Sequence, residues 1–273
     1  MPPLDVLLPL LAFLLAIGAF AGVLAGLLGV GGGIVLVPAF YYAFSVLGYG
    51  GDGLMQVCVA TSLATIVVTS WRSVKAHAAK GAVDGETLRG WGAGIAVGAL
   101  VGALVATQLR SQTLTAIFAV LALVVSAYMA FSRPGWRIAE RMPTGPVRLA
   151  YAPVVGFLSV LMGIGGGSFG VPLMTLHGVA IHRAVATAAG FGMLIAAPAV
   201  ALFLVLPVDL PRPPLTIGYV NLPAFAVIVA MTVLTAPVGA RLAHAMDPKP
   251  LKRVFAVFLF LVALNMLRRA VAG

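Results

Sequence analysis

Six long runs without a charged residue constrain the fold of this chain more than any other feature of its sequence. Each is about as long as a helix that crosses a hydrocarbon core ~30 Å thick, which needs roughly 17–25 residues. Only 9% of the residues are charged and 62% are hydrophobic, whereas about a quarter of a soluble domain is charged. The sequence therefore predicts an all-α polytopic membrane protein. The runs cover residues 6–28, 54–71, 91–109, 113–132, 184–206 and 219–240.

The distribution of basic residues indicates a lipid bilayer as partner and no nucleic acid. The formal net charge is +10, but the 17 Lys and Arg residues are scattered through the connections between apolar runs and form no block. Cytoplasmic loops of membrane proteins collect Lys and Arg, which explains the excess. The single cysteine, Cys58, lies in an apolar run, so neither a disulfide framework nor a thiolate metal site is expected. We predict no metal and no cofactor.

An internal repeat divides the chain into two similar halves. Residues 22–40, GVLAGLLGVGGGIVLVPAF, align with residues 156–174, GFLSVLMGIGGGSFGVPLM, at an offset of 134. Two shorter matches follow in the same order, residues 59–62 with 185–188 and residues 118–129 with 255–266. We therefore expect a first transmembrane repeat over residues 1–132, a charged cytoplasmic linker over 133–148 and a second repeat over 149–273.

Each half is expected to contain about four long transmembrane helices and one short helix after a glycine break, roughly eight to ten spans in all. The short segments, residues 34–48 and 168–181, decide how the halves are related. If they cross the bilayer, the halves are inverted repeats, and if they dip in and return, the halves are parallel. The inverted alternative is favoured by the positive-inside rule, because it leaves four of the 17 basic residues outside and the parallel one leaves six. Those four are Arg110, Arg212, Arg268 and Arg269.

Three consecutive glycines precede the short segment in each half. A helix that starts inside a membrane has unpaired N–H groups and partial positive charge in its first turn, so it can bind an anion without a buried cation. Duplicated breaks of this kind are typical of the midplane sites of secondary transporters. The alternative is helix packing, which we assign to the stripes Gly18, Gly22, Gly26 and Gly94, Gly98, Gly102. The candidate binding residues are Gly31, Gly32, Gly33 and Ile34, with Gly165, Gly166, Gly167 and Ser168 in the second half.

Polar side chains near the breaks are further candidates. Thr61 and Ser62 follow the first short segment, and Thr187 holds the place of Thr61 in the second half. Such hydroxyls either contact the ligand or bond back to their own helix. Three more residues, at or just past the end of the second short segment, are interfacial anchors or groups for anion guidance and proton handling. They are His177, His182 and Arg183.

The chain resembles the TauE/SafE sulfite-exporter family of membrane transporters. The resemblance rests on the duplicated GxGGG…P elements, on the AT hydroxyl element that follows each, and on AHAAKGAVD at residues 76–84. It spans nearly the whole chain, but Ala188 replaces the usual serine after the second AT. Membership implies a multi-pass protein that moves small sulfur-containing anions such as sulfite or organosulfonates.

The sequence favours a secondary transporter, an exporter of a small anion held between the two breaks, in a bacterial inner membrane. An anion channel and a non-transporting membrane subunit are the alternatives. An enzyme is not expected, because no Asp or Glu lies within a predicted span and the histidines are dispersed. The exact anion, the energy coupling and a homo-oligomeric state are left open.

Overall fold

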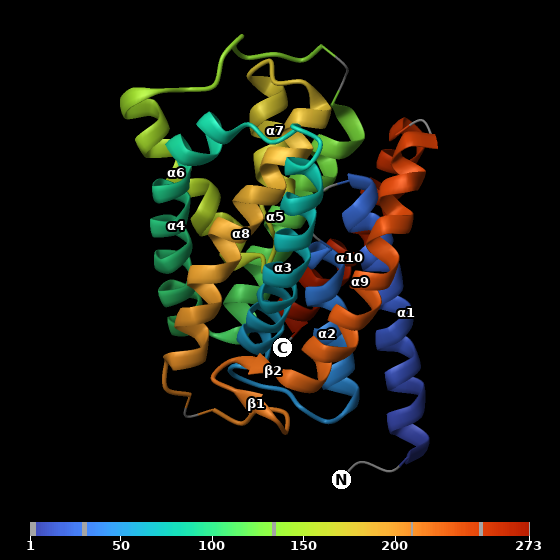
Figure 1. Ribbon diagram of the computed structural model, residues 1–273. Coiled ribbons are helices and arrows are strands. Elements are labelled where there is room, and N and C mark those ends of the chain that lie inside the picture. Colours follow the sequence, from blue (N-terminus) through green and yellow to red (C-terminus); the bar gives the residue numbers. More distant parts are fainter. Residues whose placement is uncertain (1–3, 29–31, 133–134, 209, 246–247, 273) are drawn as a thin grey trace.

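The computed structural model describes residues 4–28, 32–132, 135–208, 210–245 and 248–272. These form ten helices and one two-stranded hairpin (Figure 1). The first five helices are α1 (Leu4–Leu28), α2 (Gly33–Val46), α3 (Leu54–Ala78), α4 (Gly85–Gln108) and α5 (Ser111–Phe131). The second five are α6 (Gly145–Leu161), α7 (Gly167–Leu176), α8 (Ile181–Val205), α9 (Leu222–Ala245) and α10 (Pro248–Ala272).

Seven of the described helices are long and apolar enough to cross a membrane, which confirms the all-α polytopic prediction. The other three, α2, α6 and α7, have 14, 17 and 10 residues. The helix before the second break was expected to be long, but α6 is too short to count among the seven because it begins at Gly145-Pro146 and ends at the break. The short segment after that break also ends earlier than expected, at Leu176 instead of residue 181.

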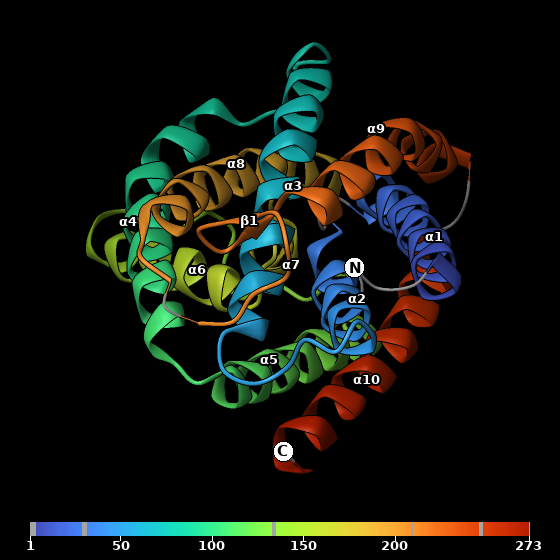
Figure 2. The ribbon, with the colours of Figure 1, turned by 90° about the horizontal axis from the view of Figure 1, so that it is seen from below.

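Helix α3 forms the centre of the bundle. It is 78% buried over its apolar window, against at most 50% for the other candidate spans. Figure 2 shows α2, α5, α8 and α9 around it, and each of the four contacts it. In Figure 1, α3 rises from the lower end of the bundle and α8 descends from the upper end.

Two parallel helix pairs flank this centre and follow the glycine stripes. Helix α1 packs along α9, and α6 packs along α4. A Cβ added to Gly22 of α1 would collide with the backbone of Thr232, and one added to Gly98 of α4 would collide with the carbonyl oxygen of Pro153. The packing role expected for these two glycines is confirmed, because only a missing side chain lets the backbones approach so closely.

Side-chain caps at two helix starts were not anticipated. The Asp84 carboxylate accepts a hydrogen bond of 3.0 Å from the amide of Thr87, which begins α4 six residues before the apolar run at residue 91. At the other end of the molecule, the Asn221 side-chain oxygen accepts from the amide of Ala224 at 3.1 Å and begins α9. Asn221 also closes a hairpin in which Thr216–Ile217 pairs with Val220–Asn221. Both residues supply the acceptor that an N-cap position requires.

Candidate functional site

The two glycine breaks are the connections between α1 and α2 and between α6 and α7. They lead into helices that start inside the bundle. Helix α2 begins at Gly33, after Gly32 in the left-handed conformation (φ 72°), and α7 begins at Gly167, after Gly166. Gly31 lies outside the described residues. Gly165 belongs to the non-helical connection before α7, and Ile34 and Ser168 are the second residues of the two short helices. Both short helices therefore direct their N-terminal ends into the protein.

The breaks are packed against each other. A Cβ added to Gly33 would collide with the carbonyl oxygen of Gly163, and one added to Gly163 would come within 2.7 Å of Val37. Gly163 also has a left-handed backbone (φ 60°), which glycine adopts without strain. On the far side of the second break, a Cβ on Gly166 would collide with the carbonyl oxygen of Ala188 in α8. Close packing thus accounts for glycine at these three positions in the conformation described.

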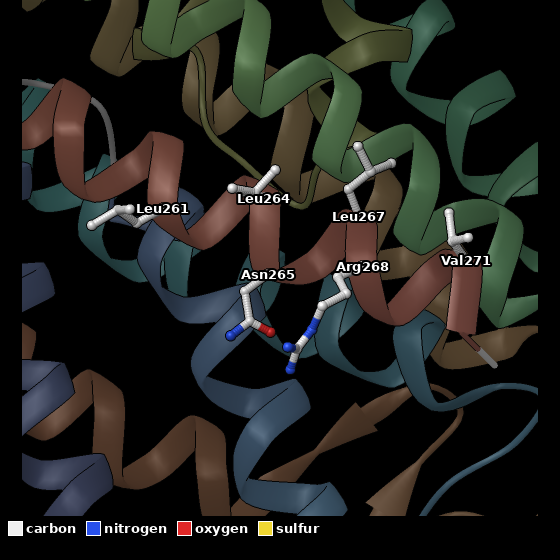
Figure 3. A pocket seen from close by; sticks show the side chains of 6 residues that line it. All are labelled: Leu261, Leu264, Asn265, Leu267, Arg268 and Val271. Carbon is white, nitrogen blue, oxygen red and sulfur yellow. The ribbon is translucent and has the colours of Figure 1, made fainter.

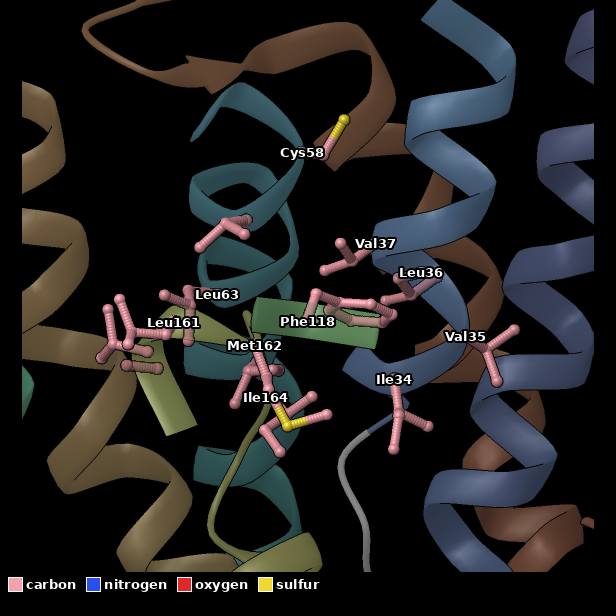
Figure 4. Packing of buried hydrophobic residues seen from close by; sticks show 14 of the residues in the cluster. Ile34, Val35, Leu36, Val37, Cys58, Leu63, Phe118, Leu161, Met162 and Ile164 are labelled. Carbon is pink, nitrogen blue, oxygen red and sulfur yellow. The ribbon is translucent and has the colours of Figure 1, made fainter. Parts of the chain in front are cut away.

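Apolar side chains surround the contact between the breaks. Figure 4 shows Ile34 of α2, Phe118 of α5 and Met162 and Ile164 of the second break in one cluster, and all four are fully buried. No Lys, Arg, Asp or Glu is buried among the residues whose exposure the structure describes. A ligand at the breaks would therefore be held by backbone amides and hydroxyls.

Hydroxyl groups gather around the second break. Ser62 of α3 donates a hydrogen bond of 2.7 Å to the carbonyl oxygen of Gly163. The hydroxyls of Ser159, in the last turn of α6, and Ser168, in the first turn of α7, are buried and have no hydrogen-bond partner among the described residues. Ser70 of α3 lies nearby, because a Cβ on Gly192 would meet both the Ser70 hydroxyl and, at 3.4 Å, the amide nitrogen of Gly166.

Ser70 and Ser159 were missed by the sequence analysis. Ser159 stands in the aligned repeat where the first half has Ala25, so a polar residue at an apolar repeat position was the signal. Ser70 has no such signal, since its approach to the break depends on how α3 packs against α8.

Thr61 and Thr187 accept hydrogen bonds from residues outside the two breaks. The Thr61 hydroxyl accepts a hydrogen bond of 3.0 Å from the amide of Asn221, and the Thr187 hydroxyl accepts one of 2.9 Å from the amide of Asp84. Each threonine thus binds the residue that caps a helix in the other predicted half. Both hydroxyls keep their own proton as a donor.

His177, His182 and Arg183 lie at the upper end of Figure 1, where α7 ends and α8 begins. Arg183 pairs with Asp84 at 3.5 Å, His182 is exposed, and the Nδ1 atom of the buried His177 bonds the carbonyl oxygen of Leu173 at 2.7 Å. The Thr87 amide, aided by Arg183, holds the pKa of Asp84 below its ordinary value. A pocket of about 570 Å³ opens here, and its charged lining includes Arg141, Arg148 and Arg183 as well as Asp84, Glu86 and Glu140.

A second pocket, of about 580 Å³, lies along α10 (Figure 3). Four of its six lining side chains are apolar, and three of these, Leu261, Leu264 and Val271, are at least half exposed. Arg268 is its one cationic side chain. This lining resembles a surface that faces lipid and offers a small anion little beyond one cation.

Comparison with known proteins places these features in context. The family described as "Sulfite exporter TauE/SafE" matches residues 14–266. A "Probable membrane transporter protein" of Haemophilus influenzae is 32% identical over 92% of this chain and 96% of its own length. A protein of Methanocaldococcus jannaschii that is also described as a probable membrane transporter is 27% identical over 94% of this chain and 96% of its own length.

Proposed function

Because this chain belongs to the sulfite exporter TauE/SafE family, we propose that it is a secondary transporter that exports a small sulfur oxyanion, such as sulfite or an organosulfonate, across the inner membrane of a bacterium. That the protein is a multi-pass membrane transporter follows from the family and from the described helices. Its substrate would lie near mid-membrane, at the two glycine breaks.

The observation that carries this proposal is the pair of short helices that begin at Gly33 and Gly167 inside the bundle. The first turn of such a helix offers free N–H groups and the positive end of the helix dipole, which together favour an anion. Broken helices of this kind are tolerated at membrane depth only where protein or a watery cavity surrounds them. Two of them, one from each half, are the arrangement that secondary transporters use at their substrate sites.

The transport cycle we propose uses the two halves as inverted repeats. The opposite directions of α3 and α8 support this relation, as do the two pairs α1–α9 and α6–α4, in which the first helix of one half packs on the fourth of the other. Rocking one half against the other would open the break region alternately to each side. The residues proposed to contact the anion are Gly31, Gly32, Gly33, Ile34, Gly165, Gly166, Gly167 and Ser168, with Thr61, Ser62 and Thr187 supplying further hydroxyls.

The membrane potential alone can drive export in this proposal. The free energy of an anion falls by about 2.3 kcal/mol for each charge and each 100 mV when it leaves a cell that is negative inside. Proton-coupled carriers commonly use an intramembrane Asp, Glu or His, and His177 is the one buried side chain of these types among the residues whose exposure the structure describes.

Transport by the purified full chain in liposomes tests this function. We expect saturable efflux of sulfite and methanesulfonate, and unlabelled methanesulfonate on one side should accelerate uptake of labelled methanesulfonate from the other. Such exchange requires a carrier. Flux that rises without saturation and shows no exchange would favour the anion channel, and no flux above that of protein-free liposomes would overturn the proposal.

A further inference from the structure

We infer that the two breaks are not equivalent and that the anion is held at the start of α7, by Ser168 and Ser159 together with the first amides of that helix, as a singly charged oxyanion. This inference rests on the proposed function and assigns its binding site to one of the two breaks. The first break then serves as the packing surface against which the second is held.

The aligned repeats differ in polarity at two places beside the glycines. Ser168 corresponds to Ile34, and Ser159 corresponds to Ala25. The duplication therefore kept the break in both halves but left the buried hydroxyls beside only one of them. Ile34 is fully buried in the apolar cluster of Figure 4, so the start of α2 offers no side-chain donor there.

The Ser168 hydroxyl is the observation that points to a ligand. Ser168 is 4% exposed, and its hydroxyl has no hydrogen-bond partner among the described residues. Buried polar groups are nearly always paired, because an unpaired one costs about 1–3 kcal/mol. Side chains of a helix tilt toward its N-terminus, so the second residue of α7 directs its hydroxyl toward the break. An anion bound there would supply the missing acceptor.

Two further features make the start of α7 suitable for this role. Ser159 is fully buried and also lacks a partner among the described residues, and it stands in the last turn before the break. The first three amides of α7 precede Gly170, whose amide bonds the carbonyl oxygen of Gly166 at 2.7 Å. Amides at the first positions of a helix have no acceptor within that helix. Ser159 and the first amides of α7 thus flank the short segment that connects α6 to α7.

The charge of the ligand follows from the surroundings. Among the residues whose exposure the structure describes, no Lys or Arg is buried, so the anion would have no full positive charge beside it. The free energy of moving an ion out of water grows with the square of its charge. Hydrogen bonds alone can offset the penalty for a single charge but not the larger penalty for two charges. A single charge is therefore the state that this site can accept.

Calorimetric titration of the detergent-purified full chain tests both parts of the inference. Methanesulfonate, which always carries one charge, is the first probe, sulfate, which carries two, is the second, and sulfite is the third. The variants are Ser168→Ala and Ser159→Ala. The matched control is Ser126→Ala, because Ser126 is also 4% exposed but its hydroxyl donates to the carbonyl oxygen of Ala256 in another part of the bundle.

We expect the unaltered protein to bind methanesulfonate at least ten times more tightly than sulfate. Ser168→Ala and Ser159→Ala should each weaken binding about tenfold, in line with the loss of one hydrogen bond to a charged group, and Ser126→Ala should leave it unchanged. Binding by both site variants within twofold of the unaltered protein would overturn the site but leave the proposed function standing. Equal affinity for sulfate would overturn the single charge, and no binding of methanesulfonate or sulfite by the unaltered protein would overturn the proposed function itself.

Discussion

At the residue scale, Ser168 and Ser126 have the same side chain and the same exposed fraction, 4%, but differ in hydrogen bonding. Ser126 donates to the carbonyl oxygen of Ala256 at 2.8 Å, whereas the Ser168 hydroxyl has no partner among the described residues. Removing a buried hydroxyl that lacks a partner removes a penalty, and removing one that is paired leaves an acceptor unsatisfied. Their replacement by alanine should therefore change stability in opposite directions.

We expect Ser126→Ala to lower the free energy of unfolding by about 1 kcal/mol and Ser168→Ala to leave it unchanged or raise it. Thermal unfolding in detergent without added anion measures both. A loss of stability in Ser168→Ala as large as that in Ser126→Ala would mean that the Ser168 hydroxyl already has a partner in the anion-free protein.

The glycines show how far the sequence predicts single residues. Three consecutive glycines in an apolar run predicted the start of each short helix to within one residue, because glycine is a poor helix former. The sequence could not predict that Gly33 faces the carbonyl oxygen of Gly163, since that contact depends on how the halves dock. It could not place Thr61 and Thr187 for the same reason, because their partners are 160 and 103 residues away.

At the element scale, Asp84 and Asn221 play equivalent parts. Each caps the fourth helix of its predicted half and donates its own amide to a threonine of the other predicted half. The apolar runs located these helices, but α4 starts earlier than its run because the Asp84 cap and the charged first turn extend it. Capping depends on one side chain and its local backbone, so a hydropathy pattern does not detect it.

The cap of α4 should make stability depend on pH. The Thr87 amide and, to a lesser extent, Arg183 lower the pKa of Asp84 from its ordinary value of 3.8. A carboxyl whose pKa is lower in the folded protein stabilises it above the unfolded pKa, and this stabilisation is lost as the pH falls through the folded pKa. We expect the midpoint of thermal unfolding to fall as the pH is lowered from about 5 toward about 2.

Asp84→Asn is the matched variant, because asparagine caps helices as well as aspartate does and stands at the equivalent position 221. It should reduce the acid-induced fall, and the unaltered protein and the variant should differ least at the acid end. An identical pH dependence in both proteins would show that other carboxyls cause the acid sensitivity.

At the scale of the whole molecule, helices of each proposed half pack mainly against helices of the other. The first helix of each half packs along the fourth helix of the other, and α5 packs along α10. Neither half therefore contains all the partners of its own helices. Without a hydrophobic driving force between helices in lipid, such packing contacts are what hold a membrane bundle together.

We expect residues 1–132 and 149–273, expressed as separate chains, to be degraded when either is made alone and to form a stable complex when made together. Co-purification through an affinity tag on one half, followed by size-exclusion chromatography, measures this. If each half alone resists protease and elutes as a single sharp species, the exchange of helices is not essential to folding.

The pairing of α1 with α9 also sets an order of events during synthesis. The end of α1 and the start of α9 are about 190 residues apart, which corresponds to roughly 10–40 s of translation at 5–20 residues per second. During that time the glycine stripe of α1 faces lipid or the insertion machinery, because α9 has not yet been made. By contrast, α4 is already in the membrane when α6 is made. A contact pattern that is symmetric in the finished protein is thus built asymmetrically, because α1 is made first and its main partner, α9, is made near the end.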